Sequence, residues 1–465
     1  MASTQLMPEG PAVPEQERGF SLCPKCLSLI LAWREQVGHE VYQVKDCPEH
    51  GRFRALIWRG PPDFASWRRP KLPAKLDYYG TKVERGCPFD CGLCPEHRQR
   101  TCTAILEVTQ GCDLHCPVCY ADASATGGPE PDLALIEKWY EAALRAGAGC
   151  NIQLSGGEPT TRHDLPEIVA MGKDLGFSFI QVNTNGLRLG HDEAYLKALA
   201  DAGLVSIFLQ FDAISDSAYK RLRGRPLLKE KLRALEACER QGIGVVLVPT
   251  IVPGLNQDQI GSILKLAIEY SPIVRAVHFQ PVSRFGRYPA SLSGEDRFTL
   301  PDLMRAIEEQ TGGLFPLASF RPPGCENALC SFQGNFLLHE DGRAQALSQE
   351  HDPCCCPSPE PAEQGALRTI ARVSRNWAAP EEAEDFPVAG RQASEPRQPI
   401  PLDQFIALAR QRTLSVSAMA FQDVWNLDMD RVRDCCIHVV APDGRLIPFC
   451  LYNLTSSQGR SLYRP

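Results

Sequence analysis

Six short apolar runs alternate with helical patterns in the middle of the chain, and this alternation limits the possible folds more than any other feature. The runs that read as strands are residues 104–108, 151–154, 177–182, 205–211, 244–249 and 274–280. Residues 132–147 are typical of a helix, because Asp132 can cap its start and Gly147 its end. Strands that alternate with helices in this way run parallel, with right-handed crossovers. The sequence therefore predicts an α/β core, either an open doubly wound sheet or a partial (β/α)6 TIM-type barrel.

Twenty cysteines, most of them in short-spaced groups, predict metal binding. The polar start of the chain lacks the basic and apolar segments of a signal peptide, so we expect a cytoplasmic protein, in which disulfides are rare. No apolar run approaches the roughly 20 residues that span a bilayer. The formal net charge of −7 gives no general attraction to nucleic acid, and we expect no nucleic-acid partner.

The sharpest cysteine motif follows the first predicted strand directly. Cys112, Cys116 and Cys119 have the spacing C-x3-C-x2-C. Iron–sulfur clusters are normally held by four cysteines, so three thiolates leave one iron open to a ligand from outside the protein. A structural zinc knuckle needs a fourth ligand, and His115 lies awkwardly between two of the three cysteines. The motif therefore favours a cluster with one open iron.

The loops after the predicted strands carry distinctive polar residues, at the strand ends where such folds bind ligands. Residues 155–159 read Ser-Gly-Gly-Glu-Pro, in which the glycines permit close backbone approach and the carboxylate of Glu158 suits an ammonium group. The next loops carry Asn183, Asn185, Gln210 and Asp212. Asn185-Gly186 is equally compatible with a plain turn. Arg223 lies in a run of charges, which we expect to be solvated.

Together these residues resemble the radical SAM superfamily, in which a C-x3-C-x2-C loop with a neighbouring aromatic residue, here Tyr120, precedes a GGEP loop. The resemblance implies a partial barrel over residues 104–290 and a 4Fe-4S cluster on Cys112, Cys116 and Cys119 that binds and cleaves S-adenosylmethionine. The implied contacts with S-adenosylmethionine are Tyr120, Gly156, Gly157, Glu158, Pro159, Asn183, Asn185, Gln210 and Asp212.

Two further groups of ligands precede the core. Cys87, Cys91 and Cys94 repeat the C-x3-C-x2-C spacing, and Cys102 or His97 can complete either an auxiliary 4Fe-4S cluster or a zinc site. Near the start of the chain, two knuckles about 20 residues apart predict a small ribbon that holds one zinc or rubredoxin-like iron ion. Its ligands are Cys23, Cys26, Cys47 and His50.

The C-terminal part holds a third group of thiols. We predict one further 4Fe-4S cluster there, and two sites are possible. Its expected ligands are Cys325, Cys330, one of the triplet 354–356 such as Cys355, and Cys436 or Cys450. Cys150 and Cys238 are isolated in apolar stretches and are expected to be buried thiols.

The layout of the whole chain resembles the tetraether lipid synthase-like branch of the superfamily, which also includes hydroxymethyl-dihydropterin methyltransferases. The resemblance implies a 5′-deoxyadenosyl radical that abstracts hydrogen from an unactivated C–H bond, either to couple lipid chains or to methylate a pterin or other small heterocycle. It also implies an external one-electron donor such as a ferredoxin or flavodoxin. A lipid substrate would bring only peripheral membrane contact. An iron–sulfur electron carrier without this chemistry is the remaining alternative.

These features divide the chain into five predicted parts. They are a disordered lead (1–19), a metal-knuckle domain (20–80), an auxiliary cluster segment (81–103), the core barrel (104–290) and a C-terminal iron–sulfur domain (291–465). Within the last, residues 353–401 are rich in proline and are expected to form a surface excursion with a short amphipathic piece at 367–377. Residues 281–313 and this excursion are the expected walls of the substrate site.

Overall fold

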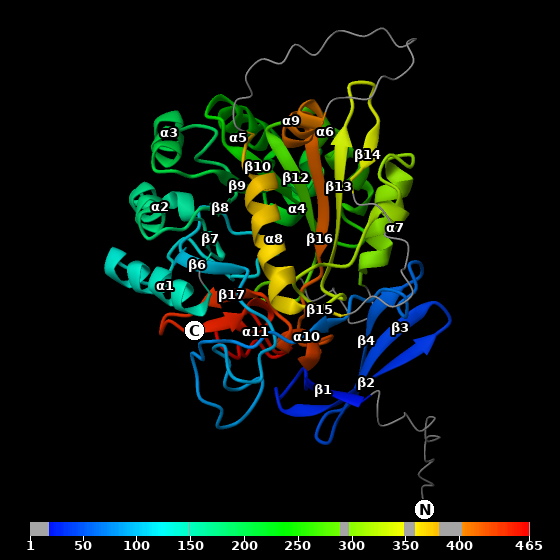
Figure 1. The fold of residues 1–465 in the computed structure, drawn as a ribbon. Coiled ribbons are helices and arrows are strands. Elements are labelled where there is room, and N and C mark those ends of the chain that lie inside the picture. The colour runs from blue at the N-terminus through cyan, green and yellow to red at the C-terminus, as the bar shows by residue number, and fades with distance from the viewer. Residues whose placement is uncertain (1–17, 148, 289–296, 348–358, 381–401, 465) are drawn as a thin grey trace, which may run out of the picture.

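A small antiparallel sheet forms the N-terminal part of the protein, at the bottom of Figure 1 in blue. The computed structural model describes residues 18–147, 149–288, 297–347, 359–380 and 402–464. Strands β1 (Arg18–Leu22), β2 (Leu29–Val37), β3 (Glu40–Cys47) and β4 (Gly51–Arg59) pair in chain order. Most of the predicted lead, residues 1–17, lies outside the described residues.

The predicted α/β partial barrel is confirmed, and its six strands run parallel. They are β6 (Thr103–Thr109), β7 (Asn151–Gly156), β8 (Ile180–Thr184), β9 (Ser206–Gln210), β10 (Gly244–Val248) and β12 (Val274–Pro281), which pair in this order, with the short β11 (Thr250–Ile251) beside β12. The strands are almost entirely buried, as expected for a parallel sheet covered on both faces.

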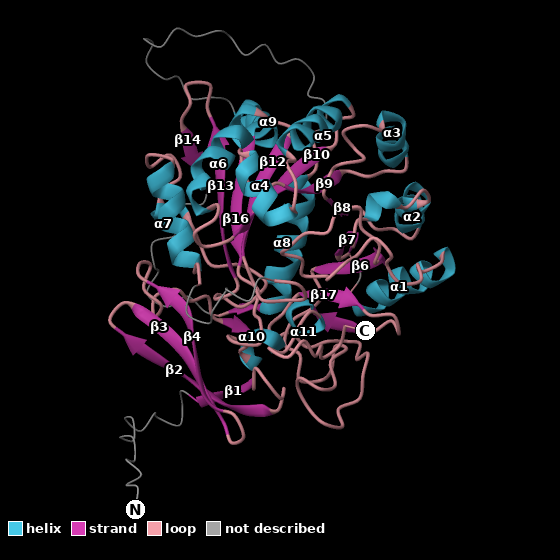
Figure 2. Cartoon of the chain, turned by 180° about the vertical axis from the view of Figure 1, so that it is seen from behind, coloured by secondary structure: helices cyan, strands magenta, loops and turns pink. Residues whose placement is uncertain are grey.

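Helices cover the outer face of this sheet, as Figure 2 shows. They are α1 (Leu133–Ala146), α2 (Leu165–Asp174), α3 (Glu193–Asp201), α4 (Asp216–Arg223), α5 (Leu228–Arg240), α6 (Ile260–Glu269) and α7 (Leu300–Gln310). Helix α1 begins as predicted, because the Asp132 side chain accepts a hydrogen bond from the Leu135 amide at 2.8 Å.

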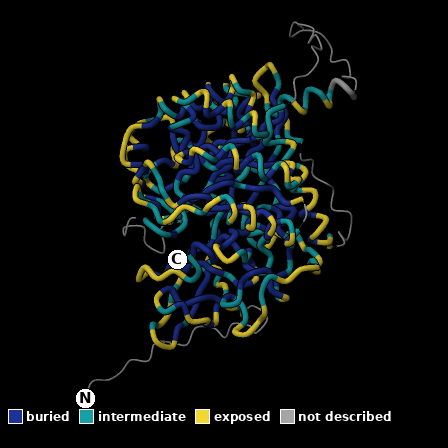
Figure 3. The backbone as a smooth tube through the Cα atoms, turned by 90° about the vertical axis from the view of Figure 1, so that its left-hand side faces the viewer, coloured by how far each residue is buried: buried dark blue, intermediate teal, exposed yellow. Residues whose placement is uncertain are grey.

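The C-terminal region extends the core sheet at both edges. Beyond β12 lie β16 (Thr413–Met419), β13 (Ser331–Leu338) and β14 (Ala344–Ala346), and beyond β6 lie β17 (Ile437–Val440) and β18 (Leu446–Pro448). The helices of this region are α8 (Ala362–Trp377), α9 (Leu402–Arg412), α10 (Met429–Arg433) and α11 (Phe449–Tyr452), and β15 (Glu360–Pro361) pairs with β5 (Lys71–Leu72). Buried backbone therefore fills the centre of the molecule, as Figure 3 shows in dark blue.

Helix α8 corrects the prediction of a surface excursion at 353–401. It contacts β10, β12 and β16, and it crosses in front of the sheet in Figure 1. Trp377 at its end packs against Phe208, with ring centroids 5.9 Å apart, and against His278 at 5.8 Å. Phe208 belongs to the face of the sheet opposite α1–α6, because side chains alternate along a strand. The apolar side of α8 is buried against this inner face, since the outer helices leave it uncovered. Residues 353–358 and 381–401 lie outside the described residues.

A buried lysine holds the N-terminal sheet to the rest of the protein. The Lys45 ammonium donates to the Ser21 hydroxyl at 3.0 Å, to the Leu22 carbonyl at 2.9 Å and to the Val424 carbonyl. Among the described residues, no helix combines the length and the apolar character that crossing a membrane requires.

Candidate functional site

The loop of Cys112, Cys116 and Cys119 follows β6 and is fixed by backbone contacts on both sides. The Cys112 amide donates to the Ser124 carbonyl at 3.1 Å, and Cys119 and Arg287 exchange two backbone hydrogen bonds of 2.8 and 2.9 Å. The Arg287 guanidinium also donates to the Cys116 carbonyl at 2.8 Å. All three thiols line one cavity of about 330 Å³. Burial raises the pKa of Cys112 to about 12, so the free thiol is protonated at neutral pH.

The glycines of the 155–159 loop let that loop lie directly against the cysteine loop. The Gly157 amide donates to the Thr109 carbonyl and the Glu158 amide to the Gly111 carbonyl, each at 2.8 Å. A Cβ atom on Gly156 would lie 2.0 Å from the Thr109 oxygen, and one on Gly157 would lie 2.2 Å from the Gly111 oxygen. Only glycine fits at either position. The two motifs therefore form one compact unit at the carboxyl ends of β6 and β7.

The Glu158 carboxylate is bound mainly by protein groups. It accepts hydrogen bonds from the Thr160 amide at 3.1 Å, and from the Thr160 hydroxyl, the Thr184 hydroxyl and the Asn185 amide at 2.6 Å each. Burial raises the pKa of Glu158, and these donors oppose that rise. The residue lines the cavity and also ties the end of β7 to the end of β8. Pro159 begins a short 3-10 helix over Pro159–Thr161 and is not among the cavity-lining residues.

Tyr120 and Asn183 give the cavity a polar corner that fits a ribose. The Tyr120 hydroxyl lies 2.9 Å from the Ser155 hydroxyl, and the Asn183 amide nitrogen donates to the same oxygen at 3.4 Å. The Asn183 side-chain oxygen is buried and accepts no hydrogen bond. A buried acceptor of this kind needs a donor, and a sugar hydroxyl supplies one. Together with the glycine loop, this corner makes the predicted residues a good fit for S-adenosylmethionine.

Asn185 is engaged locally, as in the plain turn that the sequence also allowed. Its side-chain oxygen accepts from the Leu187 amide at 2.9 Å, and its nitrogen donates to Asp113 at 2.6 Å. The carbonyl of Asn185 accepts from the fully buried Lys231 ammonium. Burial lowers the pKa of Lys231 to about 8.

Asp212 and Arg223 depart from their predicted positions. Arg223 is not a solvated charge: its side chain is 4% exposed, and its guanidinium binds the Asp212 carboxylate at 2.7 and 2.8 Å. Arg223 also donates to the Val118 carbonyl at 3.0 Å and lines the cavity beside Cys116. Asp212 is fully buried behind Arg223 and does not line the cavity, because a buried carboxylate requires a paired charge. Gln210 lines the cavity as predicted.

The four predicted ligands of the N-terminal ribbon are brought together. The sulfur and nitrogen atoms of Cys23, Cys26, Cys47 and His50 all lie within 4.8 Å of one another. The Cys26 and Cys47 sulfurs are 3.9 Å apart, and His50 Nδ1 is 3.5 Å from the Cys47 sulfur. Four sulfur and nitrogen ligands at this spacing fit one tetrahedral ion.

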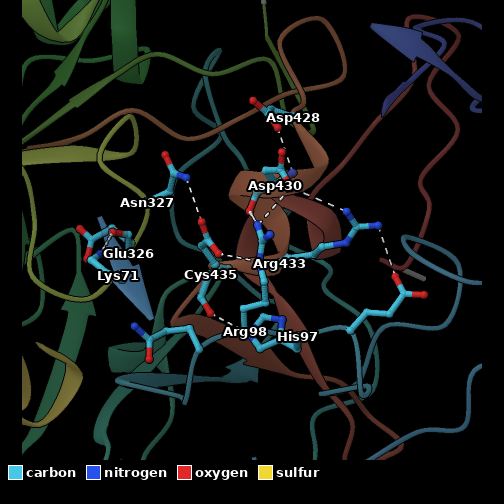
Figure 4. Close-up of polar contacts among 12 residues, drawn as sticks. Lys71, His97, Arg98, Glu326, Asn327, Asp428, Asp430, Arg433 and Cys435 are labelled. Atoms are coloured by element: carbon cyan, nitrogen blue, oxygen red, sulfur yellow. Dashed lines mark hydrogen bonds and ion pairs between the residues drawn. The ribbon is translucent and has the colours of Figure 1, made fainter. Parts of the chain in front are cut away.

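Cys87, Cys91 and Cys94 line a second, small cavity together with His97. The loop is held by Asp90, whose carboxylate accepts from the backbone amides of residues 84, 85 and 86. His97 Nε2 lies 2.8 Å from the Cys435 carbonyl oxygen, as Figure 4 shows. Burial lowers the pKa of His97 to about 4, so its ring is neutral.

The prediction that Cys102 completes this upstream set is corrected. Cys102 groups instead with Cys325 and Cys436, and the three sulfurs lie within 4.8 Å of one another. The reason is the pairing of β6 with β17, in which the Cys102 amide donates to the Cys436 carbonyl at 2.8 Å. Cysteines that precede two paired parallel strands necessarily lie close together.

The predicted C-terminal set is therefore only partly correct. Cys325 and Cys436 lie together, whereas the Cys330 sulfur accepts from Arg431 at 3.4 Å and the Cys450 sulfur accepts from the Gln422 amide at 3.2 Å. Cys330 and Cys450 lie outside the described group of three, and Cys355 lies outside the described residues.

The cavity joins the cysteine loop at one end to the group of Cys102, Cys325 and Cys436 at the other. Its middle is lined by residues that the sequence reasoning missed. They include Phe208, His278, Asn335, Arg372, Asn376, Trp377, Ser415 and Ser417. The amphipathic pattern at 367–377 was the one available signal for the α8 wall.

Comparison with known proteins agrees with this arrangement. The family model described as the Radical SAM superfamily matches residues 106–267, and the HMPTM N-terminal zinc ribbon domain matches residues 17–59. The chain is 34% identical to 7,8-dihydro-6-hydroxymethylpterin dimethyltransferase of Methanocaldococcus jannaschii over 95% of this chain and 94% of that protein. It is 28% identical to GTP 3',8-cyclase of Chlorobaculum tepidum over 50% of this chain and 71% of the cyclase. Among solved structures, Streptococcus suis SuiB bound to precursor peptide SuiA shares 16% identity over 46% of each chain, with a TM-score of 0.39.

Proposed function

Since this chain belongs to the radical SAM superfamily and to the family of 7,8-dihydro-6-hydroxymethylpterin dimethyltransferase, we propose that it methylates a pterin. The observation that carries the proposal is the cavity of about 330 Å³ that begins at the cysteine loop. Its size suits a single heterocycle beside the nucleoside of S-adenosylmethionine. The N-terminal zinc ribbon matches the same family of pterin-modifying proteins by name.

The middle of the cavity offers paired polar groups that a pterin ring can bind. The Asn335 side-chain oxygen accepts from the Ser415 hydroxyl at 2.7 Å and from the Asn376 amide at 3.3 Å. His278 Nδ1 lies 2.9 Å from the Ser417 hydroxyl. A flat ring with several donors and acceptors can exchange hydrogen bonds with such amide and hydroxyl groups, while aromatic side chains stack on its faces.

The residues at the other end of the cavity have a division of labour that fits the cofactor. Cys112, Cys116 and Cys119 would hold the 4Fe-4S cluster, which supplies reductive cleavage of S-adenosylmethionine when both are bound. Arg223 places a buried positive charge beside Cys116, which suits a carboxylate and stabilises thiolates. The chemistry also requires an external one-electron donor, for which we propose a ferredoxin or flavodoxin.

A second candidate is the coupling of alkyl chains, and an aromatic cluster beside Tyr120 favours it. The Phe449 ring centroid lies 5.6 Å from that of Tyr120, 4.5 Å from that of Phe421 and 6.2 Å from that of Phe285. Phe285, Phe421 and Phe449 all line the cavity. Apolar rings next to the cysteine loop would also suit a hydrocarbon chain end.

Transfer of deuterium from substrate to 5′-deoxyadenosine distinguishes these candidates. The anaerobically reconstituted protein would be incubated with dithionite, S-adenosylmethionine and 7,8-dihydro-6-hydroxymethylpterin deuterated at its C–H positions. We expect deuterium in the 5′-deoxyadenosine, and no transfer in a Cys116→Ala variant. Transfer from a deuterated dialkyl lipid instead of the pterin would contradict the proposal and favour chain coupling.

A further inference from the structure

The end of the cavity opposite the cysteine loop is formed by three buried thiols from distant parts of the chain. Cys102 precedes β6, Cys325 precedes β13 and Cys436 precedes β17. The sulfurs of Cys325 and Cys436 are 3.3 Å apart, and all three sulfurs lie within 4.8 Å of one another. A tetrahedral ion with metal–sulfur bonds of about 2.3 Å holds its sulfurs at comparable separations.

A carboxylate completes this group. Glu326 Oε2 lies 2.7 Å from the Cys325 sulfur and 3.9 Å from the Cys436 sulfur. Its other oxygen, Oε1, accepts a hydrogen bond from the Ser331 hydroxyl, which fixes the orientation of the carboxylate. Glu326 therefore directs one oxygen at the thiols and lines the same cavity.

The three segments that carry these groups are tied together through Asp434. Its carboxylate accepts from Arg98 Nε at 2.9 Å and from the Asn327 amide at 2.9 Å, and Figure 4 shows Arg98 and Asn327 on either side of the segment that leads to Cys435. Gln99 adds a hydrogen bond of 2.6 Å to the Cys325 carbonyl. Second contacts of this kind orient ligands at metal sites.

The local charges also call for a cation. Three thiolates and one carboxylate carry four negative charges in a buried position. The Lys71 ammonium, which donates to the Glu326 carbonyl, and the Arg372 guanidinium interact favourably with this group. These two side chains balance half of the charge, and a divalent metal balances the rest.

We propose that Cys102, Cys325, Cys436 and Glu326 bind a metal centre at the closed end of the cavity. This ligand set differs from the one expected from sequence, in which Cys330, Cys355 or Cys450 served and no carboxylate took part. Thiolates select zinc or iron, as a single ion or as an iron–sulfur cluster. The centre faces the same cavity as Cys112, Cys116 and Cys119, and its existence does not depend on which substrate the enzyme uses.

Metal analysis of matched variants tests this proposal on the full-length reconstituted protein. Cys325→Ser is expected to lose one metal complement per chain, while Cys150→Ser, which removes another buried thiol, is expected to lose none. A loss of one ion identifies a mononuclear site, and a parallel loss of four irons and sulfide identifies a cluster. Equal metal contents in the wild type, Cys325→Ser and Cys150→Ser would overturn the proposal.

Glu326→Gln tests the carboxylate separately and preserves the shape of the side chain. The variant is expected to keep 5′-deoxyadenosine formation but to change the electron paramagnetic resonance or X-ray absorption spectrum of this centre. Glu363→Gln, on the exposed side of α8, is the control and is expected to match the wild type. A spectrum unchanged in Glu326→Gln would exclude Glu326 as a ligand. Because this variant retains all three thiols, it stays informative even if Cys325→Ser fails to fold.

Discussion

Replacing Gly157 by alanine is expected to slow cleavage of S-adenosylmethionine strongly while leaving all cysteine ligands in place. The added Cβ would lie 2.2 Å from the Gly111 oxygen, 2.7 Å from the Gly111 carbonyl carbon and 2.8 Å from the Gln110 oxygen. These are backbone atoms, which cannot move aside as a flexible side chain can. The 155–159 loop and the cysteine loop must therefore separate by about 1 Å to reach ordinary contact distance.

The cost of this separation follows from the bonds that join the two loops. The Gly157–Thr109 and Glu158–Gly111 hydrogen bonds are both 2.8 Å long, and a shift of this size breaks or weakens both. Each contributes about 1 kcal/mol, so we expect the variant to lose about 2 kcal/mol of unfolding free energy. Misplacement by about 1 Å costs on the order of 100-fold in rate at an active site.

The assay compares the initial rate of 5′-deoxyadenosine formation, the iron content and the unfolding free energy of Gly157→Ala with those of the wild type. Gly19→Ala is the matched control, because the Cβ of that residue meets no atom within 4 Å. The control should retain the wild-type rate and stability. A folded Gly157→Ala protein that forms 5′-deoxyadenosine within threefold of the wild-type rate would refute the reasoning that this close approach builds the site.

Three further predictions concern separate parts of the protein. Cys116→Ala should abolish 5′-deoxyadenosine formation while iron analysis still detects metal elsewhere in the chain; continued cleavage would assign the chemistry to another cysteine set. Wild-type protein should gain stability relative to Lys231→Met as the pH rises from 8 to 10.5, because in that range the unfolded lysine binds a proton that the folded one, with its pKa lowered to about 8, does not; denaturant titrations at several pH values measure this, and a constant difference contradicts it. Cys47→Ser should lose one zinc ion per chain and become more sensitive to proteolysis within β1–β4, because the ion joins two turns of that sheet; unchanged zinc content would exclude this ligand.

The sequence predicted those features that depend on neighbouring residues. The βα alternation, the start of α1 at Asp132 and the two halves of the N-terminal ribbon are local patterns, and the structure has each of them. The cysteine and GGEP motifs were placed at adjacent strand ends for the same reason. Their direct contact was implied by the glycines, since glycine permits two backbones to approach closely.

The features that were missed depend on contacts between distant segments. Arg223 reads as one of several charges in a polar stretch, and only the buried Asp212 carboxylate explains why it is inside. The partners of Cys102 follow from the pairing of β6 with β17, which are separated by more than 300 residues along the chain. The apolar face of α8 was visible, but nothing in the sequence indicated that the inner face of the barrel would cover it.

The division of the cavity between these two kinds of feature bears on substrate choice. Residues 106–267, which match the superfamily, supply the cysteine loop, the GGEP loop and Arg223 at one end of the cavity. Asn335, Asn376 and Ser415, which line its middle, come from β13, α8 and β16, all outside the matched region. Chemistry and recognition are thus encoded in separate segments. Changes in β13, α8 and β16 can therefore alter which C–H bond lies near the cofactor without altering the residues that cleave it, since those segments pack on the inner face of the barrel and make no covalent connection to the cysteine loop.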